Sequence, residues 1–184
     1  KQKAAYEIYQ CDWSSDVCSS DLEDSQLIKF LDDEPIAVYE QHWIDNAPKQ
    51  KSFTCLGDEC PLCNLLGDKP RGKFVFNILV LSGDTPVTQV LTAAPTFARQ
   101  LRKAAEDERR GPLSKEFWEV SRSGQGPQTT YSLNYVRGRD LAEEWKLDLD
   151  TVNSSASSAR KFTESQVVRN TPRSELLELA RSLA

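Results

Sequence analysis

The chain lacks methionine altogether, and histidine occurs only once in its 184 residues. Because no methionine stands at position 1, we expect the natural start of the chain to be missing. No apolar run approaches the roughly 20 residues that a membrane-spanning helix needs, and no secretory signal is recognisable. These absences exclude a protein built on membrane-spanning helices, and they leave a single imidazole for any site chemistry.

The single histidine belongs to a pattern that is typical of a metal site, His42–x12–Cys55–x4–Cys60–x2–Cys63. Cys60 and Cys63 form a tight knuckle whose two thiolates can bind one ion. Cys55 and His42 then complete a Cys₃His set, a standard closed coordination of structural zinc. The alternative is three reduced cysteines and a surface histidine that bind no metal.

A closed set of four protein ligands leaves no position for a catalytic water, so the pattern predicts a scaffold role for the metal. We therefore predict one structural Zn²⁺ per chain and no enzymatic activity. Free cysteines at metal-binding spacing are also typical of a reducing compartment, which predicts a cytoplasmic location.

Residues 12–22, DWSSDVCSSDL, contain a Ser-Ser-Asp repeat and read as foreign sequence. Back-translated in one reading frame, the segment resembles a common short-read sequencing adapter. We therefore interpret residues 1–22 as adapter-derived or chimeric sequence rather than native structure. Cys11 and Cys18 are accordingly left out of any ligand or disulfide argument. The alternative is an ordinary loop rich in serine and aspartate.

Charge is distributed unevenly along the chain, although the formal net charge is only −5. Residues 23–68 carry 3 basic and 10 acidic side chains, and residues 69–139 carry 12 basic and 6 acidic ones. Residues 140–184 carry 6 basic and 8 acidic side chains. A basic middle between acidic ends indicates a surface that attracts a polyanion. On charge alone, a solvated surface of mixed charge is the alternative.

Alternating apolar residues and turn signals predict a mainly β fold with inserted helices. The expected strands cover 26–31, 36–43, 73–82, 86–91, 117–122 and 129–134. Phe97, Leu101 and Ala105 recur at four-residue spacing and predict a helix over 95–108, and a short helix is expected over 139–146. This pattern favours an OB-fold-type barrel with a small zinc-binding subdomain over an SH3-like barrel or a zinc ribbon.

The chain after position 152 is expected to differ from this core. Residues 153–159, NSSASSA, predict a flexible linker that is too polar and small to pack. Residues 171–184 predict a short helix with three leucines on one side, at positions 176, 179 and 183. We therefore divide the chain into non-native sequence at 1–22, a DNA-binding core at 23–152, and a flexible linker and C-terminal tail at 153–184.

An OB barrel binds single strands through a basic groove with aromatic rings, and the predicted core carries both. Each base stacked on a ring contributes about 1–3 kcal/mol without sequence preference. The candidate stacking rings are Phe74, Phe76, Trp118, Tyr131 and Tyr135, of which Phe76, Tyr131 and Trp118 are favoured. The candidate phosphate contacts are Arg71, Lys73, Arg99, Arg102, Lys103, Lys115, Arg122 and Arg137. For each ring, burial in the core is the alternative.

Five segments carry a resemblance to a known family: FLDDEP (30–35), YEQHW (39–43), CLGDECPLCNLLGDKPRGKF (55–74), PTFARQLRKAAEDERRGPLSKEFW (95–118) and GPQTTYSLN (126–134). Over about 24–152, the chain resembles the tailed-phage single-stranded DNA-binding, or helix-destabilising, proteins, which have a zinc-containing OB-fold core. The family's zinc ligands are one histidine and three cysteines, matched here by His42, Cys55, Cys60 and Cys63. The gap from Cys55 to Cys60 looks shorter than in the best-known member, which implies a trimmed zinc loop.

The resemblance implies sequence-nonspecific binding of single-stranded DNA in replication, recombination and repair, in the cytoplasm of a phage-infected bacterial cell. It also implies self-association along the strand, for which the best-known member needs a basic N-terminal arm. That arm is absent or overwritten here. The family's C-terminal tail recruits replication partners, and residues 153–184 are expected to bind replication or recombination proteins, although they are less acidic than the usual tail.

Other classes of function fit the residues less well. A zinc deaminase carries glutamate two residues after its histidine, whereas Trp43 and Ile44 follow His42. A serine or cysteine protease needs a histidine base, and the only histidine is assigned to the metal. The remaining alternative is a zinc-ribbon-like adaptor that binds protein rather than nucleic acid.

Overall fold

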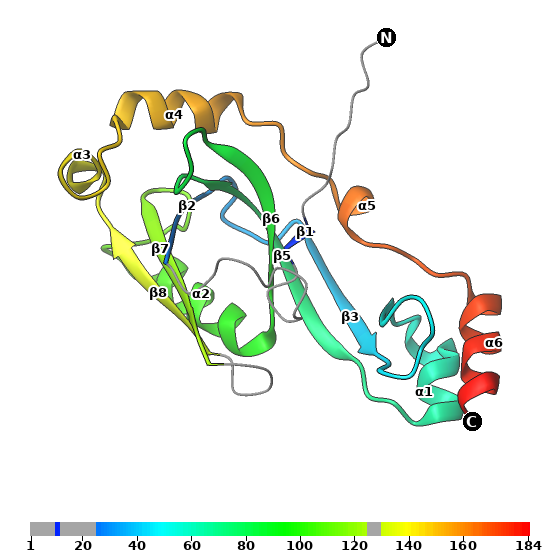
Figure 1. Cartoon of the computed structure of the whole chain (residues 1–184). Helices are drawn as coiled ribbons and strands as arrows, with labels where there is room; N and C mark the ends of the chain where they lie inside the picture. The colour runs from blue at the N-terminus through cyan, green and yellow to red at the C-terminus, as the bar shows by residue number, and fades with distance from the viewer. Residues whose placement is uncertain (1–9, 12–24, 125–129) are drawn as a thin grey trace, which may run out of the picture.

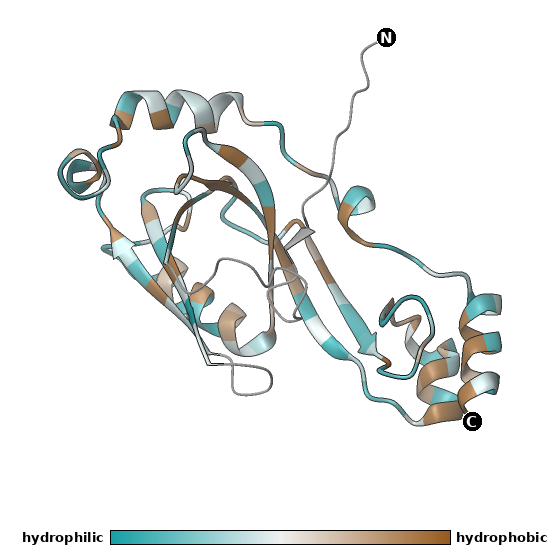
Figure 2. Ribbon diagram, in the orientation of Figure 1, coloured by the Kyte–Doolittle hydropathy of each residue, from teal (hydrophilic) through white to brown (hydrophobic). Residues whose placement is uncertain are grey.

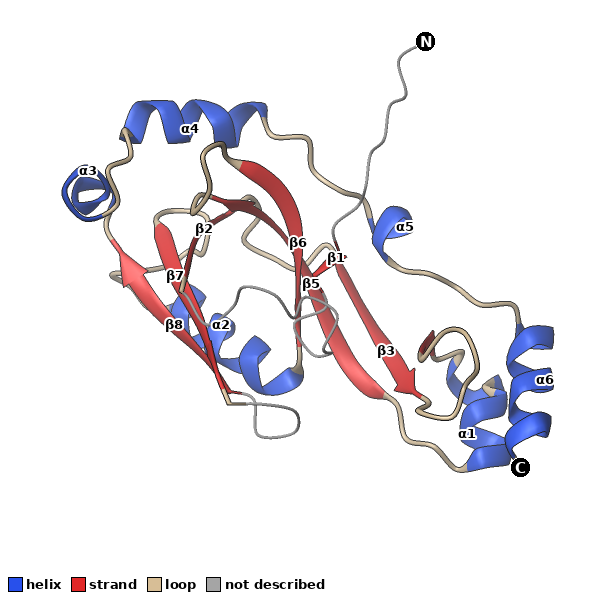
Figure 3. Ribbon diagram, viewed as in Figure 1, coloured by secondary structure: helices blue, strands red, loops and turns tan. Residues whose placement is uncertain are grey.

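The computed structural model describes residues 10–11, 25–124 and 130–184. The adapter-like segment 12–22 lies outside the described residues, and so does the 125–129 stretch of the expected closing hairpin. The described chain forms a sheet of strands with helices on both faces, and its last helix lies beside the metal-binding region (Figures 1 and 3).

Seven strands pair antiparallel: β2 (Gln26–Phe30), β3 (Ala37–Trp43), β4 (Ser52–Thr54), β5 (Arg71–Val80), β6 (Val87–Ala93), β7 (Phe117–Ser123) and β8 (Thr130–Val136). The short strand β1 (Gln10–Cys11) pairs parallel with β6 and falls within the 1–22 range interpreted as non-native. The mainly β expectation is confirmed. Strands β1 and β4 were not expected from the sequence.

Strand β5 organises the sheet because it pairs with three other strands. It lies along β6 over residues 74–80, along β3 over 71–75, and along β2 over 78–80. The sheet then continues from β2 through β7 to β8. Among the described residues, no ladder joins β8 back to β6 or β3, so backbone pairing leaves the sheet open.

In the described residues, six α-helices and two short 3₁₀ turns accompany the strands. The helices are α1 (Pro61–Leu66), α2 (Pro95–Glu106), α3 (Leu141–Glu144), α4 (Leu149–Ser158), α5 (Glu164–Val167) and α6 (Arg173–Leu183). The 3₁₀ turns cover Gly57–Glu59 and Gly138–Asp140. Within the described part of the chain, no helix is long and apolar enough to cross a membrane.

Both faces of the sheet are buried, which explains the nearly continuous burial of β2. On one face, Phe30, Phe76 and Trp118 pack with Phe97 and Leu101 from α2. On the other face, apolar strand residues pack with Leu141 from α3 and Val152 from α4; the strand residues are Leu27, Leu79, Leu81, Phe117 and Val136. Helix α2 is thus where the sequence predicts it, with its apolar stripe on the sheet.

The expectation of a flexible linker at 153–159 is wrong, because most of these residues form the second half of α4. Asp148 caps this helix by accepting hydrogen bonds from the backbone N–H and the hydroxyl of Thr151, at 2.9 and 2.6 Å. Val152 is 1 % exposed, and Ala156 packs against the same cluster. The cap, Asp148, and the buried Val152 both lie before position 153, so the composition of 153–159 alone gives no sign of the helix.

The chain after α4 runs back across the sheet and ends at the metal-binding region (Figure 1). The side chain of Asn77 holds this return at Phe162: its Nδ2 donates to the carbonyl oxygen at 3.1 Å, and its Oδ1 accepts from the backbone N–H at 2.9 Å. Val167 then packs against Val75 and Val90. The helix expected over 171–184 is confirmed as α6, with Leu176 fully buried.

Candidate metal centre and nucleic-acid surface

Three short elements position the four predicted ligands. His42 lies near the end of β3 and is fully buried, and its cross-strand neighbour on β4 is Phe53. Cys55 follows β4, and its backbone N–H donates to the carbonyl of Glu40 at 2.8 Å. Cys60 is the N-cap residue of α1, and Cys63 lies in its first turn. We call residues 42–68 the metal arm, and strands β2 and β5–β8 with α2–α4 the sheet body.

The ligand atoms lie at the spacing that one tetrahedral ion requires. The Nε2 atom of His42 is 3.4 Å from Cys60 Sγ and 3.5 Å from Cys63 Sγ, and the sulfurs of Cys55 and Cys63 are 3.6 Å apart. All four ligand atoms lie within 4.8 Å of one another. A zinc-sized ion bound at about 2.0–2.3 Å would separate its ligand atoms by roughly 3.6–3.8 Å. The donor set therefore fits a single metal ion.

Asp68 orients the histidine and was not found by the sequence analysis. Its Oδ2 lies 2.6 Å from His42 Nδ1, so the other ring nitrogen, Nε2, faces the three sulfurs. A carboxylate behind a ligating imidazole fixes the tautomer and strengthens the donor. Gly67, whose φ of +66° suits glycine, ends α1 and precedes Asp68. The 26-residue separation gave no local signal of this contact.

The knuckle favours one thiolate over the others before any metal binds. Burial raises the pKa of the Cys60 thiol, but hydrogen bonds from the backbone N–H groups of Leu56, Cys63 and Leu62 outweigh it and lower the pKa to about 7. Burial, with Cys55 alongside, raises the pKa of Cys63 to about 12. Burial also raises the pKa of Cys55. Because ligands bind as thiolates, metal binding at this site must displace protons.

The metal arm is enclosed by its own small apolar cluster and by the C-terminal helix. Ile44, Phe53 and Leu62 pack with Leu176 and Ala180 from α6. Figure 2 shows apolar residues on both α1 and α6 where these helices run side by side. The partly buried Cys55 and Cys63 lie against this cluster. An ion bound by all four side chains would have no open coordination position.

Two of the three favoured stacking rings are core residues. Trp118 is 1 % exposed and donates its indole N–H to the carbonyl of Leu113 at 2.9 Å, and Phe76 is 5 % exposed. A ring without accessible surface cannot receive a base, so the expectation that these two stack on DNA is wrong. Both lie on the sheet face that α2 covers.

The other candidate rings keep part of their surface accessible. Tyr131 packs on Phe97 with ring centroids 5.3 Å apart, and Tyr135 packs on Trp118 at 5.5 Å. Phe74 is partly buried at the margin of the same cluster. Arg110, which the sequence analysis did not single out, lies 5.9 Å from the Tyr135 ring. Phe74 belongs to β5, and Tyr131 and Tyr135 belong to β8; α2 contacts both strands.

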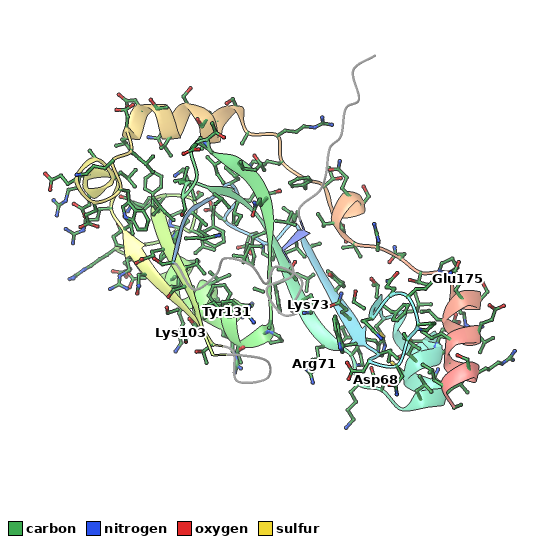
Figure 4. All side chains as sticks on the ribbon, viewed as in Figure 1. Asp68, Arg71, Lys73, Lys103, Tyr131 and Glu175 are labelled. Carbon is green, nitrogen blue, oxygen red and sulfur yellow. The ribbon has the colours of Figure 1, made fainter. Side chains whose placement is uncertain are left out.

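Most of the predicted basic contacts are accessible. The exposed members of the set are Arg71, Arg99, Arg102, Lys103, Lys115 and Arg137, and Arg122 is partly exposed. Lys73 is only 6 % exposed, and it lies on the face of β5 that carries Val75 and packs against the C-terminal segment. Its burial removes Lys73 from the phosphate contacts. Figure 4 shows Tyr131 and Lys103 beside α2 and the β7–β8 hairpin, and Arg71 next to the metal arm.

Comparison with known proteins found no match: no protein-family model matches the chain, and no curated protein or solved structure is significantly similar to it. Any statement about function therefore depends on the residues themselves.

Proposed function

We propose that this protein binds single-stranded DNA without sequence preference and that a structural zinc ion braces its fold. The observation that supports this proposal is that exposed cations and a partly exposed ring both lie at α2. Arg99, Arg102 and Lys103 lie on the outer side of this helix, and Tyr131 packs on its inner side. Cations that track phosphates and rings that stack on bases are the two components of a single-strand site.

The choice of zinc follows from the donor set. Three sulfurs and one imidazole nitrogen in a tetrahedral arrangement are typical of zinc, and hard cations such as magnesium prefer oxygen. Because the four protein ligands fill the coordination shell, the ion would stabilise the fold and would not activate water. This supports a protein that is not an enzyme.

We further propose that the sheet is an OB-type barrel. A long strand that pairs with three others, as β5 does, suits the partly open barrel of an OB-fold. The single strand would cross the side formed by α2, β8 and the first half of β5. On that side Phe74 pairs with Val38, which is 58 % exposed, so an apolar surface is accessible beside the ring.

On the resemblance to the tailed-phage helix-destabilising proteins, we propose that this activity serves DNA replication, recombination and repair within an infected bacterial cell. Self-association along the strand and recruitment of replication or recombination proteins belong to the same proposal. Since α4 and α6 pack against the rest of the chain, a partner of residues 153–184 would meet the outward surfaces of these helices.

Binding to DNA is tested by fluorescence anisotropy with a labelled oligothymidine at several salt concentrations. We expect affinity for single strands to fall as salt rises, because phosphate contacts release counterions. Replacing Arg99, Arg102 and Lys103 with alanine should reduce the slope of log affinity against log salt by about 2, near 0.7 per lost contact. Arg181→Ala on α6 removes the same type of charge far from α2 and serves as the control.

The alternative, an adaptor that binds protein, is favoured by two exposed apolar side chains at the metal arm. Trp43 is 43 % exposed beside His42, and Leu65 is 51 % exposed on α1. No binding to oligothymidine at low salt would refute the DNA proposal and favour the adaptor. Equal affinity for duplex and single-stranded DNA would refute the helix-destabilising role alone.

A further inference from the structure

Helix α6 forms one wall of the metal centre although it lies more than 100 positions further along the chain. Leu176 and Ala180 are fully buried, and they share one cluster with Cys60 and Leu62. Leu179 and Leu183 add to the margin of the same cluster. The sulfur-bearing knuckle is therefore packed on one side by a helix from the opposite end of the sequence.

Two hydrogen bonds, one from the segment before α6 and one from its first residue, join this part of the chain to residues next to the ligands. The hydroxyl of Thr54, next to Cys55, donates to the carbonyl of Arg169 at 2.6 Å. The Nε–H of Arg173 donates to the carbonyl of Glu59, next to Cys60, at 3.3 Å. Arg169 and Arg173 are thus both hydrogen-bonded to residues that adjoin a ligand.

The surface that receives α6 depends on the ligand cluster for its shape. Helix α1 has only six residues, far fewer than an isolated helix needs for stability in water. The 3₁₀ turn before it is three residues long and contains no buried residue. An ion that clamps Cys55, Cys60 and Cys63 to His42 would hold these short pieces in the arrangement against which α6 packs.

We propose that docking of α6 and binding of the metal are thermodynamically linked, with Leu176 and Ala180 as positioning residues for the metal centre. The inference rests on the metal site proposed above and is independent of DNA binding. Linkage is reciprocal: if the metal strengthens docking of α6, then docked α6 strengthens metal binding by the same factor. Loss of the ion then releases residues 173–183 from the knuckle and exposes their leucine side chains.

Release would be confined to α6, because the preceding segment is held by other contacts. Asn77 bonds both backbone groups of Phe162, and Val167 packs on Val75 in the sheet body. Neither contact involves the metal arm. The segment before α6 therefore serves as a tether that keeps the released helix near its docking surface.

Metal release from the full-length protein tests whether docked α6 strengthens metal binding. Zinc-loaded protein is mixed with an excess of a chromophoric chelator, and the rate of zinc transfer is compared between the wild type and Leu176→Ala. We expect this variant to release zinc faster, because loss of docked α6 should weaken zinc binding by a factor within the range of about 5–150 that is typical of linked sites. Thr54→Val, which removes one fastening bond without touching the cluster, should accelerate release by a smaller factor.

Leu141→Ala is the matched control, because it removes an equally buried leucine from the cluster under α3 and α4. It should lower overall stability and leave the zinc release rate at the wild-type value. If Leu176→Ala and Leu141→Ala both release zinc at the wild-type rate, the linkage is refuted. If the wild type holds no stoichiometric metal, the metal proposal itself fails, and this inference fails with it.

Hydrogen exchange tests whether bound metal strengthens docking of α6. After chelation, amides of residues 173–183 should lose protection, and those of α4 (Leu149–Ser158) should keep it. Continued protection of 173–183 in the metal-free protein would refute the inference even if the metal site is real.

Discussion

The sheet body and the metal arm are stabilised in different ways. The sheet body has long ladders and two apolar clusters that include Phe30, Trp118 and Phe117. The metal arm has a three-residue strand, a six-residue helix and a cluster of smaller residues that includes one of its own ligands, Cys60. One region is held by burial of large side chains, whereas the other packs against a helix from elsewhere in the chain and carries a group of side chains that could hold an ion.

This difference gives a reason for a metal site in the metal arm. A small region buries too little apolar surface to offset its conformational entropy, so a metal or a packed neighbour must supply the deficit. The metal arm has a packed neighbour in α6 and a ligand cluster that fits one ion. Five predictions test this difference between the two regions.

The largest effect is expected from loss of a metal ligand. Cys60→Ser should remove the ion and unfold the metal arm, since zinc binding to finger peptides has an apparent free energy of about 10–16 kcal/mol. Hydrogen exchange should show lost protection in residues 52–66 and retained protection in β5 and β7. Cys18→Ser should leave the zinc content unchanged. A single unfolding transition that loses both regions together would contradict the division between them.

The next effect is a large cavity in the sheet body. Trp118→Ala should lower the free energy of unfolding by about 3–5 kcal/mol, because the ring is buried and its indole N–H is bonded. Urea denaturation measures this loss, and zinc content should stay at the wild-type value. Trp43→Ala, at a site 43 % exposed, is the control with an expected change within about 0.5 kcal/mol.

A smaller effect should follow from changing the carboxylate behind the ligand. Asp68→Asn keeps the shape but weakens the acceptor for His42 Nδ1–H, so zinc affinity should fall about 10–100-fold. Competition with a chelator of known affinity provides the measurement. Asp58→Asn, on the exposed turn before the knuckle, should not change the affinity. Equal effects of the two variants would show that only net charge matters.

The contact of the sheet body with the C-terminal segment can be weakened separately. Asn77→Ala leaves the backbone N–H and carbonyl of Phe162 without their partner, which should cost about 1–3 kcal/mol. Limited proteolysis should then cut residues 160–168 faster. Asn77→Asp keeps an acceptor for the N–H but sets a buried carboxylate against Asp32, to which the Asn77 amide donates at 3.3 Å, so cleavage at least as fast as in Asn77→Ala is expected. Unchanged cleavage in both variants would show that apolar packing alone holds the segment.

The smallest effect concerns pH and the sheet body. Burial lowers the pKa of Lys29 below its usual 10.5, although Glu116 nearby partly raises it. Between the lowered and the usual pKa the unfolded chain binds more protons, so the free energy of unfolding should rise with pH in that window. Lys29→Met should flatten this rise in urea titrations. Lys115→Met, at an exposed position, should retain it.

Much of this architecture could be predicted because it depends on short-range patterns. Six strands, helix α2 and helix α6 follow from alternation, four-residue spacing and turn residues. The set His42, Cys55, Cys60 and Cys63 follows from ligand spacing, and its atoms do converge. The identity of the stacking rings could not be predicted, because a period of two residues says which side chains share a face but not which face is buried.

The sequence by itself determined which residue types stand at ligand spacing and which stretches form strands, since both depend on neighbours within a few positions. Tertiary structure alone decided that Asp68 orients His42, that Trp118 and Phe76 are core residues, and that α6 packs against the ligands. These facts join residues that are distant along the chain. The physical reason is that burial and side-chain convergence depend on which surfaces come into contact after folding. The pattern of neighbouring residues in the sequence does not show this.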